Sequence, residues 1–419
     1  MKMGKFSGFY RLSPEERLRL VKQERSLTGD ETKVLTDSGA LEMGKADRAI
    51  ENVIGAVHLP LGIATNFVIN GKETLVPMAV EEPSVVAAAS RAAKQTLPDG
   101  FKAEADESIM IGQVQITGIE DINTSLKNLE VNKKEVLNKA SEYMKHVEQY
   151  GCGARDFGAK AVQTDRGAMI IVNFHINVGN AQGANMVNTT LEGVSPILEQ
   201  LTEGKAKLRI VSNLASERKA KASAVWKKEL VGKAAIEGVL DAHEFAKRDI
   251  YRCSTHNKGI MNGIDAVAVA TGNDWRSVEA GAHTFAAMGR YQPLTHYYKN
   301  ENGDLVGEIE LPLAVATVGP AISSSPTAGT SLKIMDVGSS QELAMVMASV
   351  GLANNFAALS ALGTVGIQKG HMKLHARNIA AYAGARTNQE IDRVAEILTE
   401  EKNFNVERAK EVLERVREE

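Results

Sequence analysis

The chain has 419 residues, of which 43% are hydrophobic and 24% are charged. This length is more than one hydrophobic core usually serves, so it predicts two or three domains. A formal net charge of -3 argues against a nucleic-acid-binding protein, because such proteins usually carry a clear excess of basic residues. The two cysteines, Cys152 and Cys253, cannot build a disulfide framework, and a reducing compartment is expected.

No part of the sequence is expected to cross a membrane. The N-terminal residues mix charged and aromatic side chains and lack the apolar core of a signal peptide. The longest apolar stretch, residues 343–367, carries Asn354, Asn355 and Ser360, and such polar groups are costly in lipid. We interpret this stretch as a buried helix of a soluble, cytoplasmic protein.

The first segment, residues 1–108, begins with a helix that Ser13 caps and whose first turn is acidic. It continues as strands through residues 63–80, where Asn70-Gly71 is typical of a hairpin turn.

Residues 109–215 have a different sequence pattern, in which short strands alternate with helices. The pattern predicts strands at 111–119, 168–178 and 206–211, and helices at 121–150 and 185–202. Strict alternation of apolar and polar side chains over 168–178 indicates a half-buried strand of an open-faced sheet, not a doubly wound parallel sheet. We therefore predict a small α+β domain with a split β-α-β, ferredoxin-like plan.

Long helices rich in Ala and Gly return after this segment, with strands near 307–313, and the basic run from Arg218 to Lys233 is interpreted as a solvated helix face. The last residues are typical of two short charged helices. The predicted fold class is therefore α+β, with a large helix-rich domain in two pieces, a small inserted domain and a C-terminal appendage. The corresponding ranges are 1–108 with 216–376, 109–215, and 377–419.

Four clusters of polar residues are candidates for chemistry. Glu81 and Glu82 follow a strand and precede a helix, where one carboxyl held in a buried setting suits proton donation. An acidic helix start that complements the helix dipole is the alternative. Lys258 lies in a polar stretch, residues 252–263, where it suits oxyanion stabilisation, although an ordinary polar loop has the same composition. Asp274 follows an apolar run and suits either pairing with a lysine or capping of a helix.

The fourth cluster contains His371 and His375, which share a helix face. This spacing permits a metal pair, but no third ligand is indicated, and a histidine that protonates a leaving thiolate fits better. The turn at residues 178–185 combines small residues with a following helix N-terminus, which favours a pyrophosphate. Its glycines do not form the three-glycine dinucleotide fingerprint.

Taken together, the sequence resembles the class II 3-hydroxy-3-methylglutaryl-coenzyme A (HMG-CoA) reductases from about residue 40 to residue 377. The resemblance is carried by five motifs in the family's order: Glu51-Asn52-Val53-Ile54-Gly55, residues 76–84, residues 179–185, Thr271-Gly272-Asn273-Asp274, and Gly370-His371-Met372. Three positions depart from the family pattern: Asn180 replaces a usual Asp, Asn354 a Gln, and Pro320 a Gly.

The resemblance implies a role for each matching residue. Glu82, Lys258, Asp274 and His371 match the catalytic residues, with Asp274 expected between Lys258 and Glu82. The positions implied for substrate binding are Ser84, Arg252, Thr255, Asn262 and Asn354. Those implied for cofactor binding are Asn180, Gly183, Asn185 and Asn213. The small domain is expected to bind the dinucleotide, and the C-terminal appendage to act as a flap that carries His371.

The implied activity is a four-electron reduction of HMG-CoA to mevalonate and free CoA, with two molecules of NADH or NADPH and no metal. The motif at residues 51–55 implies a homodimer or a larger assembly with active sites at the interface. Two alternatives remain open: operation in the direction of mevalonate oxidation, and a non-catalytic protein that binds CoA thioesters. A hydrolase is disfavoured because the sequence has no Gly-x-Ser-x-Gly motif.

Overall fold

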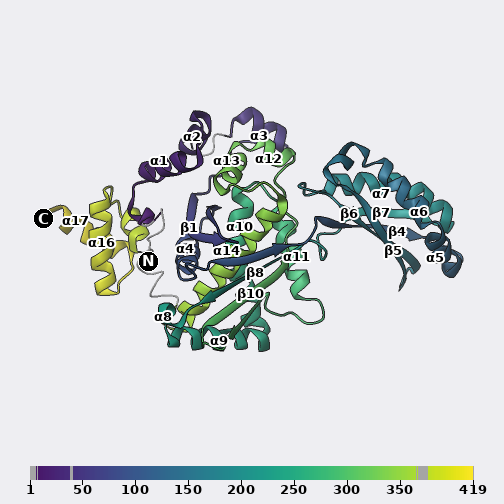
Figure 1. Cartoon of the computed structure of the whole chain (residues 1–419). Coiled ribbons are helices and arrows are strands. Elements are labelled where there is room, and N and C mark those ends of the chain that lie inside the picture. The colour runs from purple at the N-terminus through teal and green to yellow at the C-terminus, as the bar shows by residue number, and fades with distance from the viewer. Residues whose placement is uncertain (1–5, 7, 38–40, 365, 367–375, 419) are drawn as a thin grey trace.

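The computed structural model describes residues 6, 8–37, 41–364, 366 and 376–418. The fold mixes helices with two separate sheets, one of six strands and one of four (Figure 1). This confirms the predicted combination of helices and sheets.

The six-stranded sheet joins two distant parts of the sequence. Its strand order is β2-β1-β3-β8-β10-β9. The strands are β1 (Leu61–Ile69), β2 (Lys72–Ala79), β3 (Phe101–Ala105), β8 (Lys219–Trp226), β9 (Thr295–Lys299) and β10 (Leu305–Pro312). β3 pairs with β8 in antiparallel register, so that Phe101 faces Ala224 and Ala105 faces Ala220. The β1–β2 hairpin turns at Asn70-Gly71, as the sequence predicted.

Helices rich in small residues cover one face of this sheet. They are α4 (Val85–Lys94), α9 (Lys233–Arg248), α10 (Ile250–Ala270) and α14 (Ser340–Leu362). Phe356 of α14 stacks on Trp226 of β8 with ring centroids 4.0 Å apart. The backbones of α9 and α14 touch at Gly238 and Gly363, where a Cβ on Gly238 would lie 2.7 Å from the backbone of Gly363.

By length and composition, α14 is the one helix in the described part of the chain that passes as a membrane-spanning candidate. Most of its residues are buried, and it packs against α4, α9, α10, β3, β8 and β10. This environment is that of a core helix, which agrees with the interpretation of residues 343–367.

The four-stranded sheet consists of β4 (Ile109–Thr117), β5 (Gly153–Thr164), β6 (Gly167–Asn177) and β7 (Lys205–Val211), in the order β5-β6-β4-β7. Helices α5 (Ile122–Val131), α6 (Lys133–Glu142) and α7 (Ala184–Thr202) pack on the sheet and enclose a separate apolar core. Along the chain these elements run β-α-α-β-β-α-β, and every strand pairing is antiparallel. Figure 1 shows this unit at one end of the molecule, joined to the rest by a narrow connection.

Buried and partly buried polar contacts fix the connection between the two sheets. The Asn180 side-chain oxygen accepts from the backbone N–H of Ser340 at 2.9 Å, at the start of α14. Ser340 Oγ lies 3.0 Å from Ser108 Oγ. Arg218 is 4% exposed and donates to the carbonyl of Gln182 at 3.3 Å and to that of Val315. Burial lowers the pKa of this guanidinium to about 10.

The remaining helices surround the large sheet or end the chain. Around it are α1 (Pro14–Arg25), α2 (Gly29–Thr36), α3 (Met43–Ala49), α8 (Lys228–Val231), α11 (Trp275–Ala286), α12 (Pro320–Ser324) and α13 (Pro326–Met335). The C-terminal part comprises helical residues 376–382, α16 (Asn388–Glu401) and α17 (Val406–Glu418), which enclose a small core of their own. In Figure 1 it lies at the end opposite to the four-stranded unit.

Two predictions about local structure were wrong, and one alternative is excluded. The run from Arg218 to Lys233 is not one solvated helix face: it contains strand β8 and the short α8, and its alternate alanines face the core. The predicted helix at 121–150 is broken at Asn132, which ends α5 and begins α6, and it finishes as a 3-10 helix over Lys145–Tyr150. Residues 252–263, which also suited a polar loop, lie inside α10.

Candidate active site

The turn between β2 and α4 presents Glu82. Pro83 follows it, and Ser84 then adopts the left-handed backbone conformation with a φ of 79°. This conformation is costly for a residue with a Cβ, and the Ser84 hydroxyl does not cap α4 in return. The strained turn therefore leaves both the Glu82 carboxylate and the Ser84 hydroxyl available for other contacts.

Helix α10 places a row of polar side chains beside this turn. Arg252, Thr255, Lys258 and Asn262 recur at helical spacing and so share one face. Lys258 Nζ lies 3.1 Å from Glu82 Oε2, and Asn262 Nδ2 donates to the same oxygen at 3.4 Å. The side chains of Lys258 and Glu82 are 60% and 38% exposed, and such an open ion pair adds only about 0–1 kcal/mol to stability. The pair is therefore better suited to chemistry than to holding the fold.

Arg252 begins this row about 9 Å before Lys258 along the helix axis, six residues at the rise of an α-helix. Its guanidinium is partly buried, and its Nε has no hydrogen-bond partner among the described residues. Burial lowers the pKa of Arg252 from its usual value, because the charged guanidinium is partly removed from water. A bound anion would compensate for this loss of solvation. Thr255 is exposed one turn further along, where its hydroxyl donates to the carbonyl of Tyr251.

Asn354 lies below this surface, on α14. With its amide nitrogen donating to the Val85 carbonyl at 3.1 Å, its oxygen accepts from the N–H of Gly263 at 3.2 Å. It is 5% exposed and joins the start of α4 to α10. Its contacts in the structure hold together the two helices that carry Ser84 and Lys258.

Asp274 caps α11. Its carboxylate accepts from the N–H of Ser277 at 3.3 Å and from Arg276 Nε at 3.4 Å, so the capping interpretation is confirmed. The Ser277 hydroxyl donates to Asn213 Oδ1 at 3.1 Å, which links Asp274 to the segment after β7. Among the described residues, the Asp274 carboxylate contacts Ser277 and Arg276 rather than Lys258 or Glu82, and its placement between the latter two stays a prediction.

The predicted cofactor turn lies between β6 and α7. Gly183 has a φ of 94°, and a Cβ there would lie 2.4 Å from the Val178 side chain, so the turn requires glycine. No side chain caps α7, which leaves its first amide donors available to an anion, with Asn185 exposed beside them. Asn180 instead contacts Ser340, so its side-chain oxygen is already used at the junction.

His371 and His375 lie outside the described residues. Elsewhere in the described part of the chain, no group of three or more His, Cys, Asp or Glu side chains is arranged to hold a metal ion.

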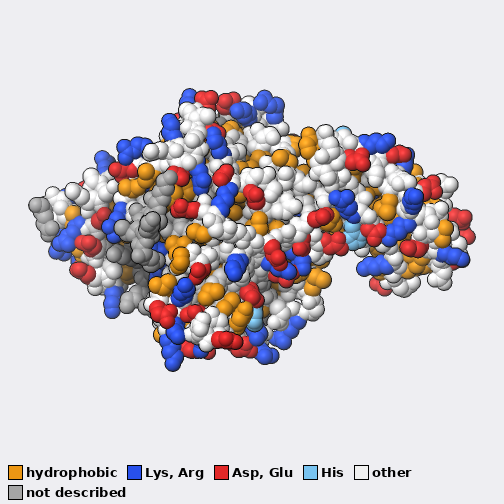
Figure 2. All heavy atoms as spheres, viewed as in Figure 1, with side chains coloured by type: hydrophobic (Ala, Val, Ile, Leu, Met, Phe, Trp, Pro, Cys, Tyr) orange, Lys and Arg blue, Asp and Glu red, His pale blue; other side chains and the backbone are white. Residues whose placement is uncertain are grey.

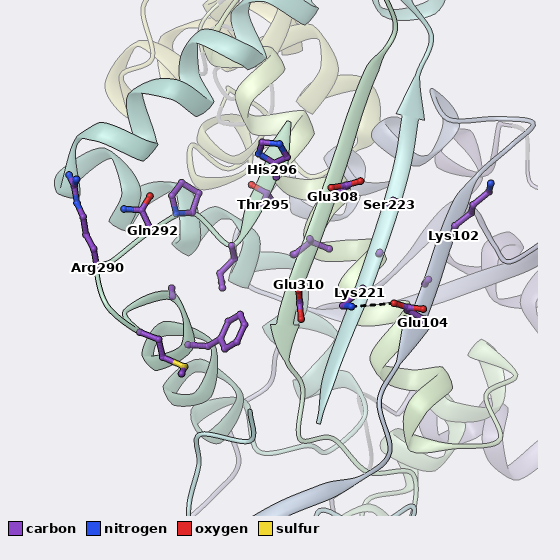
Figure 3. Close-up of a pocket in the computed structure, with 18 of the residues that line it drawn as sticks. Lys102, Glu104, Lys221, Ser223, Arg290, Gln292, Thr295, His296, Glu308 and Glu310 are labelled. Atoms are coloured by element: carbon purple, nitrogen blue, oxygen red, sulfur yellow. Dashed lines mark ion pairs between the residues drawn. The ribbon is translucent and has the colours of Figure 1, made fainter. Parts of the chain in front are cut away.

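A hollow of about 810 Å³ lies on the polar face of the large sheet, away from these residues (Figure 3). Its walls include Lys102 and Glu104 of β3, Lys221 of β8 and Glu310 of β10, with both signs of charge present. None of the candidate catalytic residues lines it.

Sequence reasoning did not single out Asp265 of α10, nor the row of Glu279, His283 and Tyr291, in which Glu279 Oε2 lies 2.7 Å from His283 Nε2 and His283 Nδ1 lies 2.7 Å from the Tyr291 hydroxyl. The available signal was spacing, since Asp265 follows Lys258 by two helical turns. The row of three side chains comes together only through the packing of α11 and the following loop.

Comparisons with known proteins agree with the motifs. A sequence model described as hydroxymethylglutaryl-coenzyme A reductase matches residues 13–376. The 3-hydroxy-3-methylglutaryl-coenzyme A reductase of Archaeoglobus fulgidus is 50% identical over 412 residues, which cover 98% of this chain and 94% of that protein. A probable reductase of the same name from Borreliella burgdorferi is 37% identical over 341 residues, covering 79% of this chain and 77% of that protein.

Solved structures show the same likeness. A 3-hydroxy-3-methylglutaryl-coenzyme A reductase from Streptococcus pneumoniae matches with a TM-score of 0.84 and 39% identity, covering 98% of this chain and all of that chain. A class II reductase from the same organism, bound to NADPH in open conformations, matches with a TM-score of 0.81 and 39% identity over 97% of this chain and 100% of that chain.

Proposed function

This chain belongs to the hydroxymethylglutaryl-coenzyme A reductase family, and we propose that it reduces HMG-CoA to mevalonate and free CoA in the mevalonate route to isoprenoids. The observation that carries this proposal is the Lys258–Glu82 pair. An ammonium group and a carboxyl group 3.1 Å apart provide an oxyanion partner and a proton donor at one point. A row of further donors on α10 leads to that point.

We propose NADH or NADPH as the reductant, held by the four-stranded unit. The uncapped start of α7 and the glycine turn before it fit a pyrophosphate, with Gly183, Asn185 and Asn180 nearest to it. Asn213 would lie toward the nicotinamide, since it follows β7 and contacts Ser277 of α11. The bound dinucleotide supplies the hydride in each of the two reductions.

The α10 row is proposed to bind the hydroxymethylglutaryl group. Arg252 would pair with the free carboxylate, and Ser84, Thr255 and Asn262 would donate to its oxygens. The axial distance of about 9 Å between Arg252 and Lys258 leaves room for a short acyl chain between the carboxylate and the thioester. Asn354 supports this surface from below.

Lys258 is proposed to stabilise the oxygen of the thioester carbonyl as it gains negative charge. Collapse of the tetrahedral intermediate expels the CoA thiolate, which His371 would protonate so that it cannot attack again. Glu82 would then give a proton to the alkoxide formed in the second reduction. Asp274 would act with Lys258 and Glu82 as a coupled set once the site is assembled.

The proposed division of the chain follows the two sheets. Residues 1–108 and 216–376 would form the substrate domain, residues 109–215 the dinucleotide domain, and residues 377–419 a flap. Each corresponds to a separate apolar cluster. A flap suits a reaction in which the dinucleotide is exchanged while the aldehyde stays bound.

We propose a homodimer or larger assembly with active sites at the interface. The segment between α3 and β1 is uncovered in the single chain, and Ile54 and Val57 are 99% and 95% exposed. Large apolar side chains this open favour coverage by another subunit. The Lys258–Glu82 pair is also open to solvent, as expected of a site completed on assembly.

We propose a cytoplasmic location. The long apolar helix α14 is enclosed by the fold, and both cysteines are free. Figure 2 shows basic and acidic side chains interspersed over the visible face, as on an ordinary water-soluble protein.

The first test measures oxidation of NADH and of NADPH with HMG-CoA as the substrate, together with release of the CoA thiol. Two dinucleotides oxidised per thiol released would establish the four-electron reaction. Lys258→Ala should abolish both reductive steps, because both develop negative charge on the same oxygen.

His371→Gln should lose reduction of HMG-CoA but retain reduction of added mevaldehyde, which requires no thiolate protonation. Equal loss of both activities in this variant would contradict the role of His371. No oxidation of either dinucleotide by folded, assembled protein would favour a CoA-thioester binding protein.

A further inference from the structure

Arg218 lies where the large sheet meets the cofactor turn, residues 178–185. It immediately precedes β8, and its carbonyl accepts from the N–H of Leu313, just after β10, at 2.9 Å. Its side-chain Nη1 donates to the carbonyl of Gln182 in the turn at 3.3 Å, and Nη2 donates to the carbonyl of Val315. The large sheet therefore holds a guanidinium group directly against the turn that begins α7.

Within the described residues, no acidic side chain forms an ion pair with this cation. Arg218 is 4% exposed, and burial lowers its pKa only to about 10, so it stays charged at neutral pH. The two acidic residues beside it have other partners. Glu217 lies 2.8 Å from His175 Nδ1, and the Asp106 carboxylate accepts from the N–H of Lys219 at 3.2 Å. The two carbonyl dipoles solvate the guanidinium in part, but they carry no net charge.

The start of α7 adds to the positive potential at the same turn. Gln182, whose carbonyl accepts from Arg218, is followed by Gly183, the N-cap residue of α7. No side chain caps this helix, and its first turn contains no acidic residue. The positive end of the helix dipole and a buried cation therefore meet at one turn.

A purely structural role does not account for the charge of Arg218. Two backbone carbonyls are satisfied equally well by a neutral amide donor, and burying a cation costs far more free energy than burying such a donor. In the low dielectric of the interior, the charge acts strongly on any ion bound nearby. What compensates for its burial is an anion on the turn.

We propose that Arg218 is a positioning residue for the dinucleotide: its buried charge, acting across the cofactor turn, holds the pyrophosphate group at the start of α7. This inference rests on the dinucleotide site proposed above. CoA also contains a pyrophosphate group, but the cofactor turn belongs to the four-stranded unit, whereas the acyl-binding row lies on α10. NADH and NADPH should depend on Arg218 equally, because both contain the same pyrophosphate group.

The main test compares Arg218→Gln with Arg218→Lys, using the fluorescence of bound NADH and NADPH without HMG-CoA. Arg218→Gln keeps a neutral donor but loses the charge, so Kd for both dinucleotides should rise on the order of tenfold. Arg218→Lys keeps the charge with fewer donors, so Kd should stay within about threefold of wild type. If the two variants bind equally weakly, Arg218 is only a structural link and the proposal is wrong.

Steady-state kinetics test the same role during turnover. In Arg218→Gln, KM for the dinucleotide should rise on the order of tenfold, while kcat and KM for HMG-CoA should stay within about threefold of wild type. A fall in kcat with an unchanged KM for the dinucleotide would contradict the proposal.

The matched control is Arg209→Gln on β7. Arg209 also donates to a backbone carbonyl, that of Ala206 at 3.0 Å, and to the Ser195 hydroxyl at 3.0 Å. Ser195 lies about 16 Å along α7 from its first residue, since the helix rises about 1.5 Å per residue. Kd for both dinucleotides should equal that of wild type. A rise of the same size there would assign the effect to overall charge and overturn the role of Arg218.

A measurement on wild type covers the case in which Arg218→Gln does not fold. The guanidinium N–H signal in the nitrogen-15 NMR spectrum that is missing from Arg218→Lys belongs to Arg218. This signal should shift when inorganic pyrophosphate is added, and pyrophosphate should displace NADH. A signal that does not move overturns the proposal.

Free CoA distinguishes the two sources of a pyrophosphate group. Its Kd should be the same in wild type and Arg218→Gln. If the Kd of CoA rises instead and that of the dinucleotides does not, Arg218 serves the substrate and the proposal is wrong. If dinucleotide binding depends on Arg218 as expected but the wild type does not reduce HMG-CoA, the proposed function fails and the role of Arg218 stands.

Discussion

Ser84, next to the candidate site, has a strained backbone conformation. Its left-handed backbone costs about 1 kcal/mol for a residue with a Cβ, and no capping hydrogen bond offsets this. The strain turns the chain sharply after Glu82, so that the carboxylate meets Lys258 rather than continuing along β2.

Ser84→Gly should relieve this strain. We expect the free energy of unfolding to rise by about 0.5–1 kcal/mol, measured by urea denaturation, because glycine adopts this conformation freely. KM for HMG-CoA should rise at the same time, since the variant lacks the hydroxyl proposed to bind substrate. A loss of stability would show instead that the Ser84 side chain makes a stabilising contact in the assembled protein.

For single residues, the sequence predicted which side chains belong to the candidate site better than it predicted which side chains touch one another. The resemblance selected Glu82 and Lys258, 176 positions apart, and the structure brings them together. Asp265 was not selected because its raised pKa depends on burial and on Glu279 of another helix. The pKa of a carboxyl is set by burial and neighbours, and neither is visible in the local sequence.

At the scale of the helices and strands, the packing of α9, α10 and β9 buries histidine side chains that have no acidic partner in the described part of the chain. His243 of α9 is 4% exposed, and neither of its ring nitrogens has a hydrogen-bond partner among the described residues. It lies between His256 of α10 and His296 of β9, with ring centroids 6.0 Å and 5.6 Å away. Burial lowers the pKa of His243 to about 4 and that of His256 to about 3.

These histidines predict acid sensitivity. The unfolded chain binds their protons near pH 6.5 and the folded chain only near pH 4 or below, so stability is complete above about 6.5 and decreases as pH falls through this window. Each histidine should contribute a slope of up to about 1.4 kcal/mol per pH unit, measured by urea denaturation.

His243→Phe keeps a ring against Tyr297, whose ring His243 meets edge-on. The variant should therefore reduce the slope of unfolding free energy against pH by the contribution of one histidine. A variant with the same pH dependence as wild type would show that His243 does not titrate in unfolding.

Strand β8 was missed for a physical reason. β8 begins with Lys219 and Lys221 alternating with alanines, and alanine is a poor indicator of a strand. Its extended form comes from pairing with β3 and β10 on both sides. In contrast, the Asn70-Gly71 hairpin and the alternating β6 were predicted correctly because their signals are local.

For the whole molecule, the parts of the chain with separate apolar cores lie at different ends. The C-terminal helices have their own apolar core, which includes Ile379, Val394 and Leu413. They lie opposite to the four-stranded unit in Figure 1. The presence of a small α+β unit between two parts of a larger one could be inferred from changes in the sequence pattern along the chain. The relative positions of the parts could not, because they depend on a few contacts such as Asn180 with Ser340.

A truncated chain ending at Gly366 should keep the large and small sheets folded, because their cores do not include the C-terminal cluster. Circular dichroism and urea denaturation should show a main transition close to that of the full chain. This chain should lose reduction of HMG-CoA and retain reduction of mevaldehyde, since only the first reaction includes the thiolate protonation proposed for His371. Loss of the main transition would mean that the C-terminal helices are required for folding.

The two ends of the inserted unit are held side by side. The N–H of Asp106 donates to the carbonyl of Lys219 at 2.8 Å, and the N–H of Lys219 donates to the Asp106 carboxylate at 3.2 Å. Strands β3 and β8 are therefore already aligned, and a tight turn of about two residues would suffice to join them. The large sheet does not need the intervening residues to set its register, so a lineage could exchange the four-stranded unit as a cassette while the six-stranded sheet stayed intact.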